Sequence, residues 1–161
     1  MGEPAVGKSC LIKRFCEARF TQKHTPTIGI DYGVKPVQIG QTNLRVNFWD
    51  LAGPEQYKQV RTEFYKDAQG ALLVFDVNSR DTYEALDKWL KEAREHGASN
   101  MVLAVCANKI DLGGRVISQG EARKWAVAHG AIYFETSAKD GTNVLEMFDS
   151  LFRDVHSSCA S

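Results

Sequence analysis

The chain has 161 residues, enough for one domain that buries a core without disulfides or a structural metal. Lysine and arginine together number 20, as do aspartate and glutamate, so no excess charge favours nucleic acid or an anionic membrane. The four cysteines have neither metal-ligand spacing nor a disulfide framework, and the longest apolar run, residues 101–107, is too short to cross a membrane. We therefore expect a soluble, cytoplasmic, single-domain protein over residues 1–161.

A phosphate-binding motif opens the sequence. Residues 2–9 read G-E-P-A-V-G-K-S, which matches G-x-x-x-x-G-K-[ST], and the apolar periodicity that follows predicts a helix. In such a turn the backbone N–H groups point at a polyphosphate, and the helix dipole adds positive potential. Lys8 supplies a mobile positive charge, and Ser9 a hydroxyl suited to Mg²⁺. For the motif alone, a helix-initiating turn with a chance lysine is the alternative.

Apolar runs of strand length then alternate with amphipathic stretches of helical spacing. The expected strands are residues 34–39, 44–49, 71–77, 101–107 and 132–135. The expected helices are residues 83–95, 121–129 and 144–155, with capping boxes that begin at Asp81, Ser118 and Asn143. The last three strands lack polar alternation, which is typical of parallel strands covered on both faces. The pattern predicts an α/β fold with helices on both faces of a mostly parallel sheet.

The first two strands should form an antiparallel hairpin around a short turn at residues 40–43. Pro36 removes a backbone donor from the first of them and predicts an edge strand. A phosphate loop normally follows a buried strand, yet only Met1 precedes Gly2. Either the numbered chain omits that strand or the central position is empty. We expect the former, because an empty position would leave two strands with unpaired backbone groups.

Two further loops can recognise a guanine base. Residues 108–111 read N-K-I-D and follow a buried strand, at the sheet edge where α/β proteins bind ligands. The carboxylate of Asp111 can accept from the ring N–H and the exocyclic amine of guanine, whereas adenine has no such donor pair. Asn108 can tie neighbouring loops together, and the stem of Lys109 can cover the ring. Residues 135–139, E-T-S-A-K, can bring backbone N–H groups to the guanine oxygen.

Taken together, these segments resemble small GTPases of the Ras superfamily, and among them the Rab branch. The resemblance is carried by G-E-P-A-V-G-K-S, T-I-G-I-D-Y at 27–32, W-D-L-A-G at 49–53, N-K-I-D and E-T-S-A-K. The combination of I-D-Y-G-V, E-F-Y-K-D and V-C-A-N-K-I-D is similar to the Rab-like RJL group, whose animal members are fused to a J domain. This chain has no His-Pro-Asp triplet, so we expect no J domain in it. The resemblance implies a P-loop NTPase G domain with a six-stranded sheet and one antiparallel edge strand.

Site residues follow from the resemblance by position. It implies that Ser9 and Thr27 ligate Mg²⁺, that Asp50 reaches the metal through water, that Gly53 donates to a γ-phosphate and that Phe20 packs edge-on to the base. Taken singly, Thr27 is more simply explained as a turn hydroxyl and Asp50 as a strand-end cap. The implied nucleotide-binding residues are Ala5, Val6, Gly7, Lys8, Ser9, Cys10, Phe20, Thr27, Gly53, Asn108, Lys109, Asp111, Ser137, Ala138 and Lys139.

The chain departs from the family pattern at Pro54. The family reads D-T-A-G-Q where residues 50–54 read D-L-A-G-P, and the family's glutamine orients the attacking water. Proline has neither an N–H nor a polar side chain, so we name no catalytic residue and expect very slow intrinsic GTP hydrolysis. Gln56 is more naturally a solvated residue than a substitute, since Pro54 restricts the loop. Pro4 in the phosphate loop should leave binding intact.

The resulting hypothesis is a GTP/GDP switch with Mg²⁺, monomeric, without nucleic acid as a partner. Residues 22–32 and 50–66 would order around the γ-phosphate and meet effector, exchange factor and GTPase-activating proteins. Their exposed apolar side chains are expected to be Ile28, Ile30, Tyr32, Trp49 and Tyr57. Cys159 lies one residue short of a C-a-a-X box, so membrane association is expected only through partners. The alternatives are a non-hydrolysing scaffold that stays in one nucleotide state, and a P-loop kinase, for which no arginine-rich lid is apparent.

Overall fold

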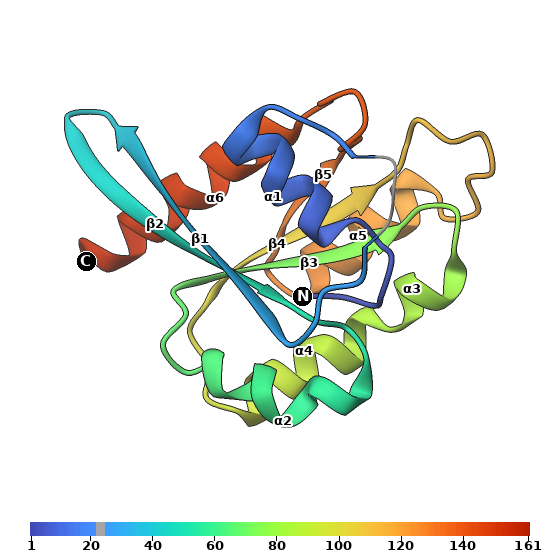
Figure 1. The fold of residues 1–161 in the computed structure, drawn as a ribbon, viewed down its shortest axis with the longest axis horizontal. Helices are drawn as coiled ribbons and strands as arrows, with labels where there is room; N and C mark the ends of the chain where they lie inside the picture. Colours follow the sequence, from blue (N-terminus) through green and yellow to red (C-terminus); the bar gives the residue numbers. More distant parts are fainter. Residues whose placement is uncertain (22–24) are drawn as a thin grey trace.

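The computed structural model describes residues 1–21 and 25–161, in which strands and helices alternate along the chain (Figure 1). The strands in these residues are β1 (Ile30–Ile39), β2 (Thr42–Leu51), β3 (Gly70–Asp76), β4 (Val102–Asn108) and β5 (Ile132–Glu135). The α-helices are α1 (Lys8–Glu17), α2 (Lys58–Arg61), α3 (Arg80–Glu84), α4 (Leu86–Glu95), α5 (Gln119–Ala128) and α6 (Val144–Cys159). Two 3₁₀ helices, η1 (Glu55–Tyr57) and η2 (Thr62–Phe64), flank α2. The expected α/β class is confirmed.

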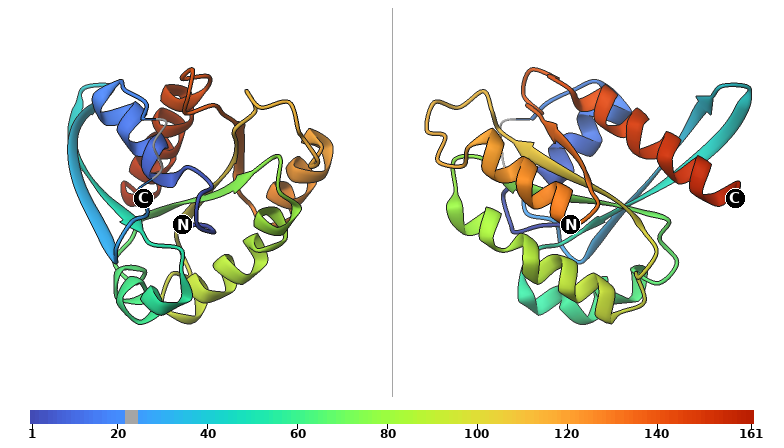
Figure 2. Two further views of the ribbon diagram at one scale, coloured as in Figure 1. Left: turned by 45° about the vertical axis from the view of Figure 1, so that its right-hand side comes forward. Right: turned by 180° about the vertical axis from the view of Figure 1, so that it is seen from behind.

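The strands form a hairpin and a separate parallel sheet. β1 and β2 pair antiparallel from Ile30 opposite Leu51 to Ile39 opposite Thr42, which confirms the expected hairpin. β3, β4 and β5 pair in parallel in that order. Pro36 lies within β1, which pairs with β2 alone in the described residues, as expected of an edge strand. Figures 1 and 2 show the tip of the hairpin on the same side of the molecule as the C-terminal end of α6.

Between β2 and β3 the sheet is not continuous within the described residues, so five strands in two sheets stand where the expected fold has six in one. Met1 alone pairs with β3 at this position: its nitrogen donates to Leu72 O at 2.6 Å, and Val74 N donates to Met1 O at 2.9 Å. An apolar cavity of about 610 Å³ lies alongside, lined by β2, β3 and α6. The phosphate loop therefore starts directly from a residue that pairs with the edge of β3.

Alternate side chains of β3 pack into two apolar layers, one on each face of the sheet. Val74 packs into a cluster with residues of α1 and α6, whereas Leu73 and Phe75 pack into a second cluster with residues of α4 and α5. Because successive side chains of a strand point to opposite faces, one strand can serve both layers. Figure 1 shows α1 and α6 on one side of the sheet and α2, α3 and α4 on the other. Helices thus cover both faces, as the apolar strands predict.

Helix starts agree with the sequence only in part. The Ser118 side chain caps α5 by accepting from Glu121 N at 3.1 Å, as predicted. The other two predicted side-chain caps are wrong, although α6 does begin directly after Asn143 as predicted. α3 begins after Ser79 rather than at Asp81, and Asn143 adopts a left-handed conformation, with its side chain donating to Glu135 O at 2.8 Å. At Asn143 a contact with Glu135 thus takes the side chain that the pattern assigns to a cap, whereas α3 simply begins earlier in the sequence than predicted.

No helix in the described part of the chain is both long enough and apolar enough to span a bilayer.

Replacing Phe148 by alanine should destabilise the layer formed by α1 and α6. Its ring is 3% exposed and lies 4.7 Å from the Phe15 ring and 5.8 Å from the Phe48 ring, between centroids. We expect the free energy of unfolding to fall by about 3–5 kcal/mol in urea titrations, because the substitution leaves a cavity. Leu145→Ala on the same helix, at a side chain that is 60% exposed, is the matched control and should cost little. Equal losses for the two variants would contradict this packing.

Candidate functional site

The phosphate loop turns sharply into α1 between β3 and the loop that follows β4. Gly7 precedes α1 with φ 101°, and Ala5 also adopts a left-handed conformation with φ 63°. A Cβ atom at Gly7 would lie 2.4 Å from Asn108 Nδ2, so only glycine fits at this contact. A cavity of about 110 Å³ opens in front of α1, lined by the loop, by residues 25–27 and by Gly53 and Pro54. The N-terminus of α1 therefore borders a concave surface, which is a favourable place for an anion.

Lys8 lies along this loop. Its Nζ atom donates to Gly2 O at 2.9 Å and to Glu3 O at 2.8 Å, so the ammonium group sits inside the turn. Burial lowers the pKa of Lys8 to about 8, although Asp50 and Glu3 act in the opposite direction. The charge of Lys8 is therefore poorly hydrated. An anion entering the cavity would restore favourable electrostatics around it.

Three hard oxygen donors converge beside Lys8. Ser9 Oγ lies 2.9 Å from Thr27 Oγ1 and donates to Asp50 Oδ2, and Thr27 Oγ1 lies 3.4 Å from that same oxygen. Asp50 is 6% exposed, and its Oδ1 atom is buried without a hydrogen-bond partner in the described residues. A buried carboxylate oxygen with no donor calls for a cation, and Mg²⁺ favours a few such oxygens together with phosphate and water. Ser9, Thr27 and Asp50 therefore fit a Mg²⁺ ion.

Asn108 joins the phosphate loop to the two loops expected to recognise a base. Its Nδ2 atom donates to Val6 O at 2.9 Å, and its Oδ1 atom accepts from Thr136 Oγ1 at 3.0 Å. The Asn108 side chain is 1% exposed, so both bonds are shielded from water. Thr136 Oγ1 also lies 2.9 Å from Cys106 Sγ. One amide thus fixes three segments that are far apart in the sequence.

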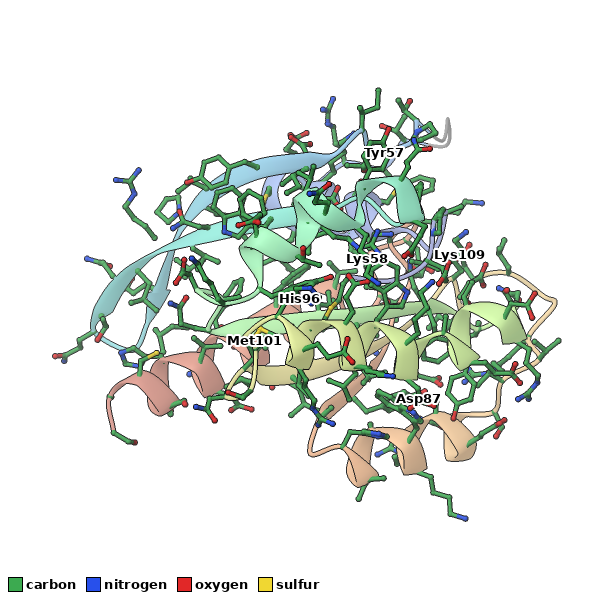
Figure 3. All side chains as sticks on the ribbon, turned by 90° about the horizontal axis from the view of Figure 1, so that it is seen from below. Tyr57, Lys58, Asp87, His96, Met101 and Lys109 are labelled. Carbon is green, nitrogen blue, oxygen red and sulfur yellow. The ribbon has the colours of Figure 1, made fainter. Side chains whose placement is uncertain are left out.

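Asp111 stands at the rim of this cluster. Its Oδ1 atom accepts from Ser137 Oγ at 2.8 Å, while the residue as a whole is exposed. Lys109 adopts a left-handed conformation with φ 65°, and its Nζ atom donates to Ala5 O at 2.6 Å (Figure 3 labels Lys109). The 108–111 and 136–139 loops are therefore held side by side, with a carboxylate of Asp111 accessible to a ligand.

Comparison with known proteins agrees with this architecture. A model of the Ras family matches residues 1–157. The chain belongs to the Ras family. It is 47% identical to "DnaJ homolog subfamily C member 27" of Danio rerio, 48% identical to that of Bos taurus and 46% identical to that of Homo sapiens. Each alignment covers 99% of this chain and 60% of the relative, so the chain spans about 60% of the length of these curated relatives.

This assignment confirms the resemblance to the Ras superfamily, and the DnaJ names agree with the resemblance to the RJL group. Most of the site residues taken from the family pattern lie around the cavity or the 108–111 and 136–139 loops. Phe20 differs from these residues, because it is half-buried and packs against the apolar cluster of α1 and α6. Residues 22–24 of the expected switch segment lie outside the described residues.

An aromatic patch lies on the face expected to bind partners. Tyr32 and Trp49 are 51% and 43% exposed, their ring centroids are 4.4 Å apart, and Trp49 lies 4.7 Å from the Phe64 ring. Ile28 is 80% exposed, whereas Ile30 and Tyr57 are only partly exposed. Sequence analysis missed Phe64, because Phe64 and Tyr65 are adjacent and no periodicity in this stretch indicates which of the two rings is buried.

Sequence analysis also missed long-range hydrogen bonds that fix the positions of the 136–139 loop and the phosphate loop. Arg14 of α1 donates through Nε to Ala138 O at 2.8 Å and also bonds Lys139 O. Glu3 accepts from Trp89 Nε1 of α4 at 3.1 Å. These contacts span more than 80 residues, so no local motif could have indicated them.

The binding of GDP should weaken as pH rises through the pKa of Lys8. In the nucleotide-free protein that pKa is lowered to about 8 by burial, whereas bound phosphate favours the charged form. Below that pH the ammonium is already present; above it, binding must take up a proton, so the affinity falls by up to about tenfold per pH unit. Calorimetric titration with GDP across this range measures the effect.

Two lysine variants separate this effect from general titration. Lys8→Met should abolish the slope together with much of the affinity, whereas Lys91→Met, on the exposed side of α4, should keep it. An affinity that stays constant in the unmodified chain from neutral to alkaline pH would contradict the role of Lys8.

Proposed function

We propose that this chain is a guanine-nucleotide switch that binds GDP and GTP together with Mg²⁺. The observation that carries the proposal is the bonding of Asn108 to both the phosphate loop and Thr136, which sets a phosphate cavity beside a carboxylate-bearing loop. A ligand that fits both must carry phosphate at one end and hydrogen-bond donors at the other. A guanine nucleotide has this chemistry.

Each part of the site has a role in binding. Lys8 and the N-terminus of α1 attract the phosphates, and the oxygens of Ser9, Thr27 and Asp50 would hold Mg²⁺, which neutralises phosphate charge when bound. Asp111 accepts from the guanine edge, with Ser137 orienting its carboxylate. Lys109 covers the ring with its stem while its ammonium group bonds Ala5 O and lies 3.5 Å from Asp76 Oδ2.

Slow turnover is part of the proposal. Pro54 borders the phosphate cavity, and its ring offers no group that can orient an attacking water. Gln56 is exposed in η1. Exchange of nucleotide and help from a partner would therefore control the switch more than its own chemistry. A non-hydrolysing scaffold is the second candidate, and Pro54 is the observation that favours it.

Partners would recognise the nucleotide state through the expected switch segments, residues 22–32 and 50–66, of which residues 22–24 lie outside the described part of the chain. The adjoining rings of Tyr32, Trp49 and Phe64, of which Tyr32 and Trp49 are exposed, supply an aromatic surface beside these segments, of the kind enriched at protein interfaces. This surface would bind an effector, an exchange factor and a GTPase-activating protein in competition with one another. We propose a cytoplasmic, monomeric switch. Its association with membranes would come through such partners.

Replacing Asp111 by alanine should remove the preference for guanine. We expect the affinity for GDP to fall by about tenfold or more, because the lost interactions are hydrogen bonds to a charged group. The affinity for ADP should not change. Asp140→Ala, an exposed carboxylate on the neighbouring loop, is the matched control. Calorimetry with each nucleotide and Mg²⁺ measures both, and equal binding of GDP and ADP by the unmodified chain would refute guanine recognition.

Replacing Pro54 by glutamine should accelerate GTP hydrolysis in single-turnover assays. We expect a gain of roughly ten- to hundredfold, because the variant regains a side chain that can orient water. Gln56→Ala, a change to an exposed neighbour, should leave the slow rate of the unmodified chain unchanged. If Pro54→Gln stays as slow as the unmodified chain, the missing side chain is not the cause. Permanently bound GTP in both proteins would then favour the scaffold.

A further inference from the structure

Arg61, at the end of α2, is buried although it belongs to the segment expected to switch. Its side chain is 0% exposed, and it lies between the 52–54 loop and α4 rather than at the phosphate cavity. Figure 3 shows the short helix that carries Lys58 beside α4, whose C-terminal end is followed by His96. A fully buried arginine must find partners for all its donors, and each partner it selects is thereby fixed in place.

One side of the guanidinium group forms an ion pair with α4. Nε donates to Glu92 Oε1 at 2.8 Å and NH2 donates to Glu92 Oε2 at 2.9 Å, a bidentate pair between side chains that are both shielded from solvent. Tyr65 donates to Glu92 Oε1 at 2.6 Å, and the Arg61 Cζ atom lies 4.4 Å from the centroid of the Trp89 ring. Burial raises the pKa of Glu92, but the hydrogen bonds from Arg61 and Tyr65 outweigh it and lower the pKa below its usual value. The pair is therefore ionic at neutral pH.

The other side of the guanidinium group hydrogen-bonds to backbone carbonyl groups that border the phosphate cavity. NH1 donates to Pro54 O at 2.8 Å, and it lies 3.3 Å from both Ala52 O and Gly53 O. In a trans peptide the C=O of one residue and the N–H of the next point in opposite directions. Because Ala52 O faces Arg61, the N–H of Gly53 faces away from Arg61. Gly53 and Pro54 line the phosphate cavity on that opposite side.

Among residues 52–54, the N–H of Gly53 is also the one backbone donor that remains available to a ligand in the phosphate cavity. Ala52 N donates to Gly29 O at 2.9 Å, and Pro54 has no N–H. The Gly53 N–H donates to no protein acceptor within the residues that the structure describes. A Cβ atom at Gly53 would lie 2.7 Å from Pro4 N and 2.9 Å from Gly2 O, so the loop rests directly on the phosphate loop.

The helix that binds Arg61, α4, also binds the phosphate loop. Glu3 accepts from Trp89 Nε1 and from Lys88 Nζ, each at 3.1 Å, and Trp89 is the ring over which Arg61 stacks. The positions of the phosphate loop and of the Gly53 amide are thus both set relative to one helix outside the switch.

We propose that Arg61, anchored by Glu92, is a positioning residue that turns the Gly53 N–H into the phosphate cavity and so selects a nucleotide with a third phosphate over one with two. This inference rests on the proposed nucleotide binding. Arg61 does not touch the nucleotide; it acts through the carbonyl groups of residues 52–54. Its effect therefore falls on the γ-phosphate and not on the base or the first two phosphates.

The test compares affinities for GDP and for a non-hydrolysable GTP analogue, both with Mg²⁺. The variant is Arg61→Met, Tyr65→Phe and Glu92→Met combined, which removes the network without leaving a buried charge or hydroxyl unpaired. We expect its affinity for GDP to stay near that of the unmodified chain. Its affinity for the analogue should fall by about ten- to hundredfold, the weight of a hydrogen bond to a charged group.

Glu55→Gln is the matched control, because Glu55 is exposed and lies 3.5 Å from the same guanidinium group. It should leave the affinity ratio unchanged. Arg61→Lys provides a second variant that keeps a buried cation, and it should lower the ratio less than the triple variant; it also serves if the triple variant does not fold.

The outcomes separate the inference from the proposed function. An unchanged ratio in folded variants overturns the positioning role, and so does an equal loss for both nucleotides, since that is what a merely structural role produces. If the unmodified chain binds neither nucleotide, the proposed function itself fails and the inference fails with it. A selective loss of the analogue in the variants supports both.

Discussion

The side chain of Asn108 is the constraint on which the site depends. Buried at 1% exposure, it bonds the carbonyl of Val6 on one side and the hydroxyl of Thr136 on the other. Its amide fills the space in which any Cβ at Gly7 would stand, so the glycine of the phosphate loop and the asparagine after β4 require each other. Hydrogen bonds in such a dry place are strong when complete and costly when broken. The loops can therefore be short and still keep a fixed spacing, which is what a ligand with two distant recognition ends needs.

The second buried network, Arg61 with Glu92 and Tyr65, is organised differently. Asn108 ties loops whose positions should not change, whereas Arg61 ties a segment of the expected switch to α4, outside it. A buried ion pair adds little stability relative to apolar residues, yet the loss of one partner alone costs about 3–5 kcal/mol. Such a network is a poor way to gain stability and an effective way to hold one geometry. Its location under the 52–54 carbonyls agrees with a conformational role more than with a packing role.

Local signals account for what the sequence could predict. The alternation of apolar runs gave the order of strands and helices, and Pro36 indicated the edge strand, because period and proline geometry act within a few residues. The G-x-x-x-x-G-K-S and N-K-I-D segments indicated residues that do lie around one site. What could not be predicted comes from contacts across the fold: Glu3 with Trp89, Arg14 with the 138–139 carbonyls, and the burial of Arg61. The side-chain cap at Asn143 was wrong for the same reason, since it donates to the distant carbonyl of Glu135, whereas the cap at Asp81 was wrong because α3 begins after Ser79.

Under the proposed function, Pro54 would affect binding and turnover in opposite directions. Its φ of −57° lies within the range that the ring imposes, so the loop adopts this shape without strain. The Pro54 carbonyl makes the shortest of the three bonds between the loop and Arg61 NH1, at 2.8 Å. Proline offers no side chain that could orient water and, at the same time, reduces the entropy lost when the 52–54 backbone is fixed. In the proposed switch, a glutamine at this position would favour turnover, whereas the proline would favour retention of one bound state. The combination of a stiff loop and a buried arginine beneath it is the arrangement expected of a switch whose timing is set by its partners.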